Sequence, residues 1–224
     1  MAVPTPPRSL KIGTIIDKTL GVIERNVTPV LAYVAGLTVI NGAITYFSRD
    51  MTRVTDALVL GIAGIAVGIV AAYLLLEAVI GHMGLRSRTH EDTFLTYCGM
   101  SILATLGILG GFILLIIPGL VIIARWMLAG PLVIARGDGA KRALGESWER
   151  TRGAEFPILI ALLALVIVPI VVMIASGIMF EPTDPVGIGI SQLASSGMAA
   201  VVQMMGVALY GLMIGTSAAT NPAG

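Results

Sequence analysis

The chain has 224 residues, of which 56% are hydrophobic and only 12% are charged, and its net charge at pH 7 is +1. About a quarter of the residues in soluble domains are charged, so this composition excludes an ordinary water-soluble protein. The near-neutral charge, with no arginine-rich patch interleaved with aromatic residues, gives no reason to expect binding to nucleic acid.

The charged residues gather in short segments that separate apolar runs of about 20 residues, the length that crosses a hydrocarbon core about 30 Å thick. We therefore predict an all-α fold, in which residues 1–224 form a single polytopic membrane helix bundle. Six transmembrane helices in three hairpins are expected, with two cytoplasmic amphipathic helices at the interface. The predicted spans are about 27–47, 57–80, 94–117, 120–135, 156–178 and 187–214.

The N-terminal segment is predicted in two parts. Residues 1–8 are rich in proline and are expected to be disordered, and residues 9–25 are expected to form an amphipathic helix. Its apolar residues recur at steps of three and four, and it carries too many charges to span a membrane. Two placements stay open: the helix lies in the interface, or it docks on the protein's own cytoplasmic loops.

Two glycine-bearing features lie in the predicted spans. The second span has a stripe of small residues, Gly61, Gly64, Gly68 and Ala72, which predicts close packing against another helix. Residues 101–135 form an apolar stretch that is too long for one helix and barely long enough for two. We predict a tight hairpin with Pro118 and Gly119 at its turn. The alternative is a re-entrant hairpin, which enters the membrane and returns to the same side without crossing.

Residues 138–152 are predicted to form a second amphipathic helix on the cytoplasmic side. Arg142, Glu146 and Arg150 follow one another at four-residue steps, the spacing of ion pairs on a helix surface. Trp148 suits the headgroup zone, and the cations near it suit anionic lipids. The predicted headgroup contacts are Lys141, Arg142, Trp148, Arg150 and Arg152.

The distribution of basic residues predicts the orientation. The segments on one side of the predicted spans carry eleven lysines and arginines, whereas those on the other side carry only Arg49 and Arg53. Because basic residues in short loops are retained in the cytoplasm, both termini are expected there.

A family resemblance rests mainly on the central residues. The chain resembles bacterial membrane proteins of the YciC-like group and the related membrane domain found ahead of some glycerophosphoryl diester phosphodiesterases. The residues that carry it are Ile117-Pro118-Gly119, Arg125, Leu128-Ala129-x-Pro131 and Ala143-Leu144-x-x-Ser147-Trp148-x-x-Thr151-Arg152-Gly153, and the opening Leu10-x-Ile12-Gly13-x-Ile15-x-Asp17 is similar too. The resemblance implies a six-helix protein of the bacterial inner membrane. The sequence ends at Gly224 without a segment like the soluble phosphodiesterase domain, so we do not expect that activity.

Polar residues inside the predicted spans are the candidate functional positions, because an ionisable group there costs about 2.5 to 3.5 kcal/mol to insert. Arg125, Glu77 and Gln203 form our candidate intramembrane polar site. Arg125 and Glu77 pair if their helices touch. Alternatively, Arg125 reaches headgroups or carbonyls freed at the Pro118 turn, and Glu77 reaches headgroups. Gln192, Gln203 and Asn41 are expected to make interhelical hydrogen bonds.

The sequence gives little support for catalysis. Neither His82 nor His90 lies in a predicted span, so Ser195 and Ser196 lack the imidazole base that a serine hydrolase needs. The two histidines also lack the spacing of a zinc motif. We therefore expect no enzyme activity, no metal and no cofactor. Two functions remain: a non-enzymatic protein that acts through lipid or membrane-protein contacts, and a transporter or lipid-translocating protein with a cavity near Arg125.

Overall fold

The structure, a computed structural model, describes residues 10–48, 54–86 and 92–214. All the regular elements within these ranges are α-helices, in agreement with the predicted fold class. The predicted disordered segment, residues 1–8, lies outside the described residues. The helices are α1 (Ile12–Arg25), α2 (Val27–Ser48), α3 (Val54–His82), α4 (Thr93–Leu114), α5 (Ile116–Trp126), α6 (Ala129–Arg136), α7 (Ala140–Arg150), α8 (Glu155–Met179) and α9 (Pro185–Met213).

Six stretches of the described chain are long and apolar enough to cross a membrane. They are Val27–Ser48, Leu58–His82, Thr93–Leu114, Ile116–Arg136, Glu155–Met179 and Pro185–Met213. Five of these consist of a single helix, and the fourth joins α5 and α6 across a break. The chain is a multi-pass integral membrane protein.

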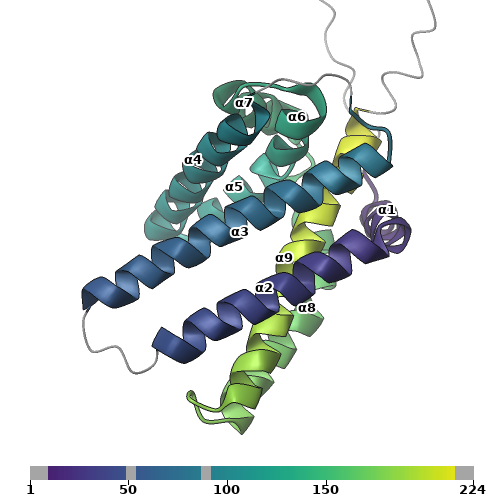
Figure 1. Ribbon diagram of the computed structural model, residues 1–224. Coiled ribbons are helices and arrows are strands. Elements are labelled where there is room, and N and C mark those ends of the chain that lie inside the picture. Colours follow the sequence, from purple (N-terminus) through teal and green to yellow (C-terminus); the bar gives the residue numbers. More distant parts are fainter. Residues whose placement is uncertain (1–9, 49–53, 87–91, 215–224) are drawn as a thin grey trace, which may run out of the picture.

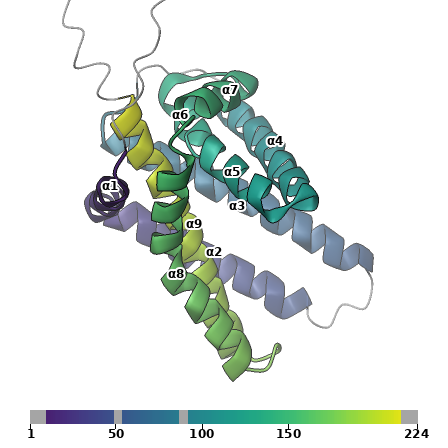
Figure 2. The ribbon, with the colours of Figure 1, turned by 180° about the vertical axis from the view of Figure 1, so that it is seen from behind.

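The helices gather at one end of the molecule and spread apart toward the other. α6, α7 and the last turns of α3 and α9 lie together, and we call this end the α7 end (Figures 1 and 2). The α4–α5 turn and the α8–α9 turn point away from the α7 end in different directions (Figure 1). The last turn of α2 and the first turn of α3 also point away from it (Figure 1). α9 is central, since α1, α2, α6 and α8 all pack on it.

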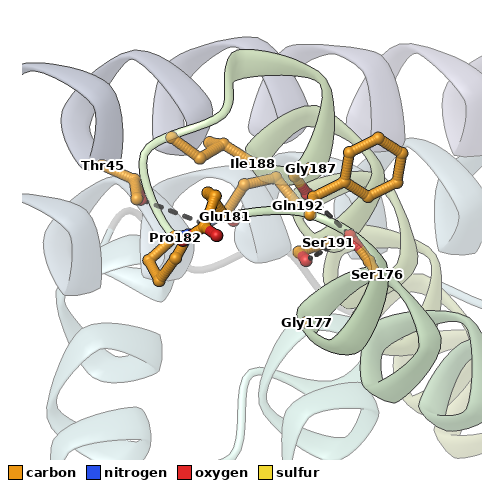
Figure 3. A pocket seen from close by; sticks show the side chains of 10 residues that line it. Thr45, Ser176, Gly177, Glu181, Pro182, Gly187, Ile188, Ser191 and Gln192 are labelled. Atoms are coloured by element: carbon orange, nitrogen blue, oxygen red, sulfur yellow. Dashed lines mark hydrogen bonds between the residues drawn. The ribbon is translucent and has the colours of Figure 1, made fainter.

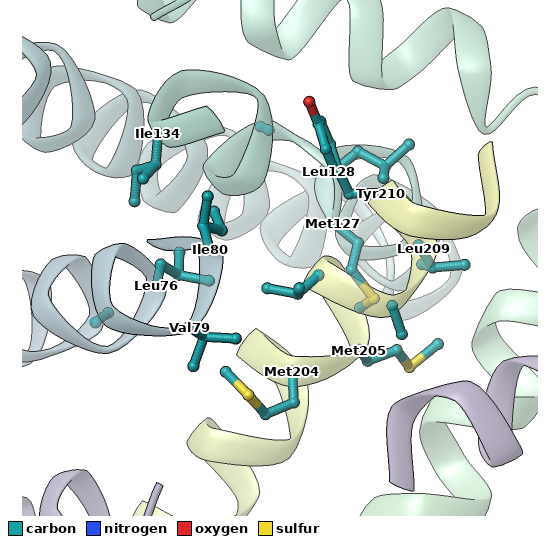
Figure 4. Close-up of a cluster of buried hydrophobic side chains, with 14 of the residues drawn as sticks. Leu76, Val79, Ile80, Met127, Leu128, Ile134, Met204, Met205, Leu209 and Tyr210 are labelled. Atoms are coloured by element: carbon teal, nitrogen blue, oxygen red, sulfur yellow. The ribbon is translucent and has the colours of Figure 1, made fainter. Parts of the chain in front are cut away.

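The main hydrophobic core lies near the α7 end. Leu76, Val79 and Ile80 of α3 meet residues of α6 and of the C-terminal half of α9 there (Figure 4). Seven of the eight residues of α6 are buried. Methionines 204 and 205 fill the space between the helices, a role suited to their flexible side chains.

Away from this core, the spans bury little of their own surface. In the apolar windows of α2 and α3, only 11% of the residues are buried in the protein, and in those of α4 and α8 the share is 17%. In α9 it is 50%. The predicted close packing along the small-residue stripe of α3 is therefore only partly right. A Cβ added at Gly61 or Gly68 would meet no atom within 4 Å, whereas Ala72 is buried.

The turn between α4 and α5 differs from the prediction. The chain reverses at Leu115, whose backbone is extended, with φ −168° and ψ 156°. Pro118 and Gly119 belong to the first turn of α5, so the prediction that they form the turn itself is wrong. The amide groups of a helix's first turn have no partner within the helix, and a proline therefore fits there without loss.

Glycines let α4 and α5 approach closely. A Cβ on Gly111 of α4 would lie 2.9 Å from the Cα of Gly119 in α5, and one on Gly107 would overlap the Trp126 ring. Real Cβ atoms do not approach backbone this closely, so the two helices would have to separate. Two helix backbones in lipid associate by such close contact, because no hydrophobic effect drives them together.

α1 docks on the bundle itself. Its buried residues, Ile15, Thr19 and Val22, face α8 and α9, which also explains why its opposite face carries the charges. The predicted alternative of docking on cytoplasmic loops is wrong in this respect, because the partners are helices of the bundle.

The close approach of α4 and α5 leads to a stability prediction. We expect Gly111→Ala to destabilise the protein by about 1–3 kcal/mol, the usual cost of overpacking. Gly110→Ala is the matched control, because a Cβ at Gly110 meets nothing within 4 Å. Replacing this helical glycine by alanine should stabilise by up to about 1 kcal/mol. Thermal unfolding in detergent measures both, and equal behaviour of the two variants would contradict the packing described.

Candidate functional site

The helix of the fourth predicted span is broken in its middle. α5 ends at Trp126 and α6 begins at Ala129, so the prediction of one helix over 120–135 is wrong. Pro131 has no N–H to bond the carbonyl of Met127. α9 passes close to this carbonyl, because a Cβ at Gly206 would lie 2.7 Å from its oxygen. The break thus frees backbone groups inside the protein.

Two hydroxyl groups of the Ala143–Gly153 motif bind the freed backbone. Ser147 Oγ donates to the carbonyl of Arg125 at 2.6 Å and accepts from the amide of Leu128 at 3.2 Å. Thr151 Oγ1 lies 3.2 Å from the same carbonyl. Ser147 and Thr151 are fully buried. Because water is scarce in such a site, unbonded backbone groups would be costly, and α7 supplies the missing partners.

The side chain of Arg125 ties the same junction to α8. Its guanidinium forms an ion pair with Glu155, the first residue of α8, and donates to the carbonyl of Trp148 at 2.9 Å. It also lies over the Trp148 ring, 4.7 Å from the ring centroid, in a cation–π contact. The ionic side chains are only 13% and 15% exposed. Arg125 therefore connects α5, α7 and α8.

The predicted polar site is not formed as one group. Glu77 pairs with Arg86 at 2.9 Å instead of with Arg125. Arg125 does bond a carbonyl, but that of Trp148 and not one freed at the Pro118 turn. Gln203 lies beside Tyr97 of α4, in line with its predicted interhelical role. The structure thus gives each of the three residues a different partner.

A second cluster of ionic groups links α6 to α7. Arg136 contacts Glu146 at 2.6 Å and Asp138 at 3.3 Å, and Arg150 contacts Glu146 at 2.7 Å. Arg142 is 3.5 Å from Asp138 and is 72% exposed. Of the predicted headgroup contacts, Arg150 is thus half-buried and engaged with Glu146, whereas Arg142 keeps most of its surface free. Lys141, Trp148 and Arg152 are exposed.

The neighbours of Glu146 favour its charged form. Its carboxyl group is 18% exposed. Burial alone would raise the pKa of Glu146, but hydrogen bonds from Arg150 and Arg136, together with the charge of both guanidinium groups, outweigh burial. The pKa of this carboxyl therefore lies below its usual value.

The elements that build this junction lie within the part of the chain that a family model matches. The family model for the membrane domain of glycerophosphoryl diester phosphodiesterase matches residues 99–210, that is 112 of the 224 residues. The chain belongs to this family. No curated protein and no solved structure matches it. The match to the phosphodiesterase membrane-domain family runs from α4 to α9 and includes the break, Ser147 and Arg125, as the resemblance in the sequence implied.

A hollow lies at the opposite end of this membrane domain, between α2, α8 and α9 (Figure 3). Its volume is about 250 Å³, and Glu181 and Ser176 are among the residues that line it. Gln192 donates to Thr45 Oγ1 at 3.1 Å there, which confirms the interhelical bond expected for Gln192. The hollow itself is not evident from the sequence, since Thr45 is far from the other lining residues, which lie between residues 176 and 192 and form no motif.

The histidine in the described chain has a structural contact. His82 Nδ1 lies 2.9 Å from Oδ1 of the buried Asn26, joining the end of α3 to the start of α2. His90 lies outside the described residues. Within the described ranges, no three acidic, histidine or cysteine side chains are grouped so that they could hold a metal ion.

The buried ion pair gives a prediction about coupling. Arg125→Met or Glu155→Met alone leaves one buried charge unpaired and should cost about 3–5 kcal/mol. The double variant should lose clearly less than the sum, because it leaves neither charge buried without its partner. Unfolding free energies from detergent denaturation measure this cycle. The matched cycle is Arg86→Met with Glu77→Met, a pair that is 32% and 38% exposed, where we expect less than about 1 kcal/mol of coupling. Additive losses at Arg125 and Glu155 would contradict the pairing.

The position of Glu146 gives a prediction about pH. A depressed pKa in the folded state means that the stabilisation is complete above the unfolded value, about 4.3, and is lost as the pH falls through the folded value. Glu146→Gln should therefore lower stability at neutral pH and weaken its decline between about pH 5 and pH 3. Thermal unfolding at a series of pH values tests this. Glu149→Gln, an exposed control on the same helix, should keep the wild-type pH profile. Identical profiles for the Glu146 variant and the wild type would show that the network is not formed.

Proposed function

We propose that the chain is a non-enzymatic protein of the bacterial inner membrane that acts through contacts with lipids and other membrane proteins, in maintenance of the envelope. The observation that carries this proposal is the small buried share of four of its spans, 11% to 17%. A chain that folds around a self-contained internal site would bury more of its helices in itself. Here most of the apolar surface is turned outward, where lipid or another membrane protein meets it.

The α7 end supports a preference for anionic lipids. Lys141, Arg142 and Arg152 are exposed there, close in sequence to the 40% exposed Trp148. Each basic group near an anionic membrane surface contributes about 1 kcal/mol, and tryptophan favours the headgroup region. In this proposal α7 and both termini face the cytoplasm, the side on which the basic segments of the sequence are retained.

The transporter alternative depended on a cavity near Arg125. Discontinuous helices do line the substrate sites of many transporters, where their freed backbone groups bind the cargo. In this chain Ser147 binds the freed groups of Arg125 and Leu128, and the Arg125 guanidinium is covered by Trp148 and paired with Glu155. These contacts support a structural role for the junction and favour the first function.

The test is native mass spectrometry of gently extracted protein. We expect anionic phospholipids to be enriched on the wild type relative to the membrane from which it comes. In the triple variant Lys141→Gln, Arg142→Gln, Arg152→Gln, affinity should fall about fivefold per charge removed. The matched control removes the three exposed cations of α1: Lys11→Gln, Lys18→Gln, Arg25→Gln. If the control loses as much anionic lipid as the α7 variant, or if the wild type shows no enrichment, the proposed role of α7 is wrong.

A further inference from the structure

The tip of the α4–α5 hairpin is an aliphatic surface without polar side chains. Residues 113–117 are five consecutive isoleucines and leucines that are 68% to 86% exposed. The sequence has no polar side chain from Leu106 to Ala124. Such a run of exposed apolar residues is unfavourable in water and suits a hydrocarbon environment.

The other two connections at the ends of hairpins are polar. Residues 49–53, between α2 and α3, include two arginines and an aspartate, and Asp56 follows in the first turn of α3. Residues 181–184, between α8 and α9, include a glutamate and an aspartate. A turn that leaves the membrane needs such residues, because its side chains and backbone meet water. The composition therefore sets the α4–α5 turn apart from the other two.

The depth of the turn follows from the length of α5. Arg125 is level with the first residue of α8, since it pairs with Glu155, and the Trp126 and Trp148 rings lie 6.4 Å apart at the same level. Tryptophan is enriched at membrane–water interfaces, and we place the interface at this level. From Arg125 back to Leu115 the helix rises about 15 Å, half of a hydrocarbon core about 30 Å thick. α8 has 25 residues, so from the same level it reaches about 37 Å. In both views the α4–α5 turn ends short of the α8–α9 turn (Figures 1 and 2).

The break after Trp126 explains why sequence length alone suggests a full span. α5 and α6 together are long enough to cross, but α6 is enclosed by α3, α4, α7 and α9 and belongs to the core. Only the 11 residues of α5 are left to enter the lipid on this side of the hairpin.

Some of the backbone groups at the turn have partners within the chain. The Leu115 amide donates to the carbonyl of Gly111 at 3.0 Å, and the Leu115 carbonyl accepts from Gly119 at 3.4 Å. Pro118 removes one further amide donor from the first turn of α5. Because unbonded backbone groups are costly in hydrocarbon, these features fit a turn placed there.

We infer that the α4–α5 hairpin is re-entrant: it turns near the middle of the bilayer, and its tip, residues 113–117, contacts lipid acyl chains. The chain then enters and leaves the membrane on the α7 side through α4 and α5. The inference does not depend on the proposed function, because it rests on depth and composition alone.

Cysteine accessibility tests the depth of the turn. In a Cys98→Ser background, Leu115→Cys and Ile113→Cys report the tip, Glu181→Cys reports the α8–α9 turn, and Lys141→Cys reports the α7 side. Sealed vesicles of both orientations are treated with a membrane-impermeant maleimide, before and after denaturation in sodium dodecyl sulfate. We expect the two tip cysteines to react only after denaturation, and the two reference cysteines to react from opposite sides of intact vesicles. Reaction of a tip cysteine from the side that labels Glu181→Cys would show that the hairpin crosses, and reaction from the α7 side would show that it stays at the surface.

A spin label provides a second reading on the same tip variants, provided that each elutes as the wild type in size-exclusion chromatography. At both tip positions the spin label should collide more often with oxygen than with a water-soluble nickel chelate. This is the result expected for a label at a depth of about 15 Å. The label at Glu181→Cys should show the reverse. An interfacial or aqueous profile at the tip would overturn the inference.

Discussion

Hydrogen bonding of the backbone freed between α5 and α6 is the constraint on which the rest of this structure depends. A helix interrupted inside a membrane protein leaves carbonyl and amide groups that water cannot reach, and each must find a partner in the chain. Ser147 meets this need for two of them at once, from a helix about twenty residues further along. The position of α7 is therefore determined by the break.

This constraint spreads through Arg125 to the other helices. Its backbone carbonyl binds the hydroxyls of α7, and its side chain binds the start of α8. A buried ion pair by itself adds little stability, because desolvation offsets the attraction of the charges. Its value lies in geometry, since it fixes where α8 begins relative to α5. α8 then fixes one side of α9, on which α1, α2 and α6 also pack.

Sequence patterns were sufficient for the spans and insufficient for the junction. Hydropathy depends on residue type alone, so the positions of α2, α3, α8 and α9 were predicted to within a few residues. The break at Met127 lies four residues before Pro131, but the partners that bind the freed groups of Arg125 and Leu128 come from Ser147 and Thr151, about twenty residues further along. Likewise Arg125 was placed inside a span with Glu77 as its possible partner, because Glu155 lay in a predicted loop. The family resemblance did name Arg125, Ser147, Trp148 and Thr151, without showing that they touch.

The turn at Leu115 shows why soluble-protein turn signals mislead in lipid. Pro118-Gly119 is a strong turn signal in water, where a chain reverses with solvated backbone groups. In hydrocarbon each bonded backbone group lowers the cost of a reversal, and the extended Leu115 between α4 and α5 binds Gly111 through its amide and Gly119 through its carbonyl. Pro118 and Gly119 have other roles. Pro118 leaves one fewer free amide in the first turn of α5, and Gly119 has no side chain, so that Gly111 can approach its backbone closely.

The molecule thus combines a buried end with helices whose surface beyond it is mostly exposed. Buried residues of α3, α6 and α9 and the Arg125 contacts hold the α7 end, whereas most side chains of α2, α4 and α8 meet no other part of the described chain closely enough to be buried. A protein that acts through its lipid and protein contacts needs this division, because the exposed surface is where those contacts form. The family match covers α6, α7 and most of α9 at this end, and leaves α1, α2 and α3 outside it.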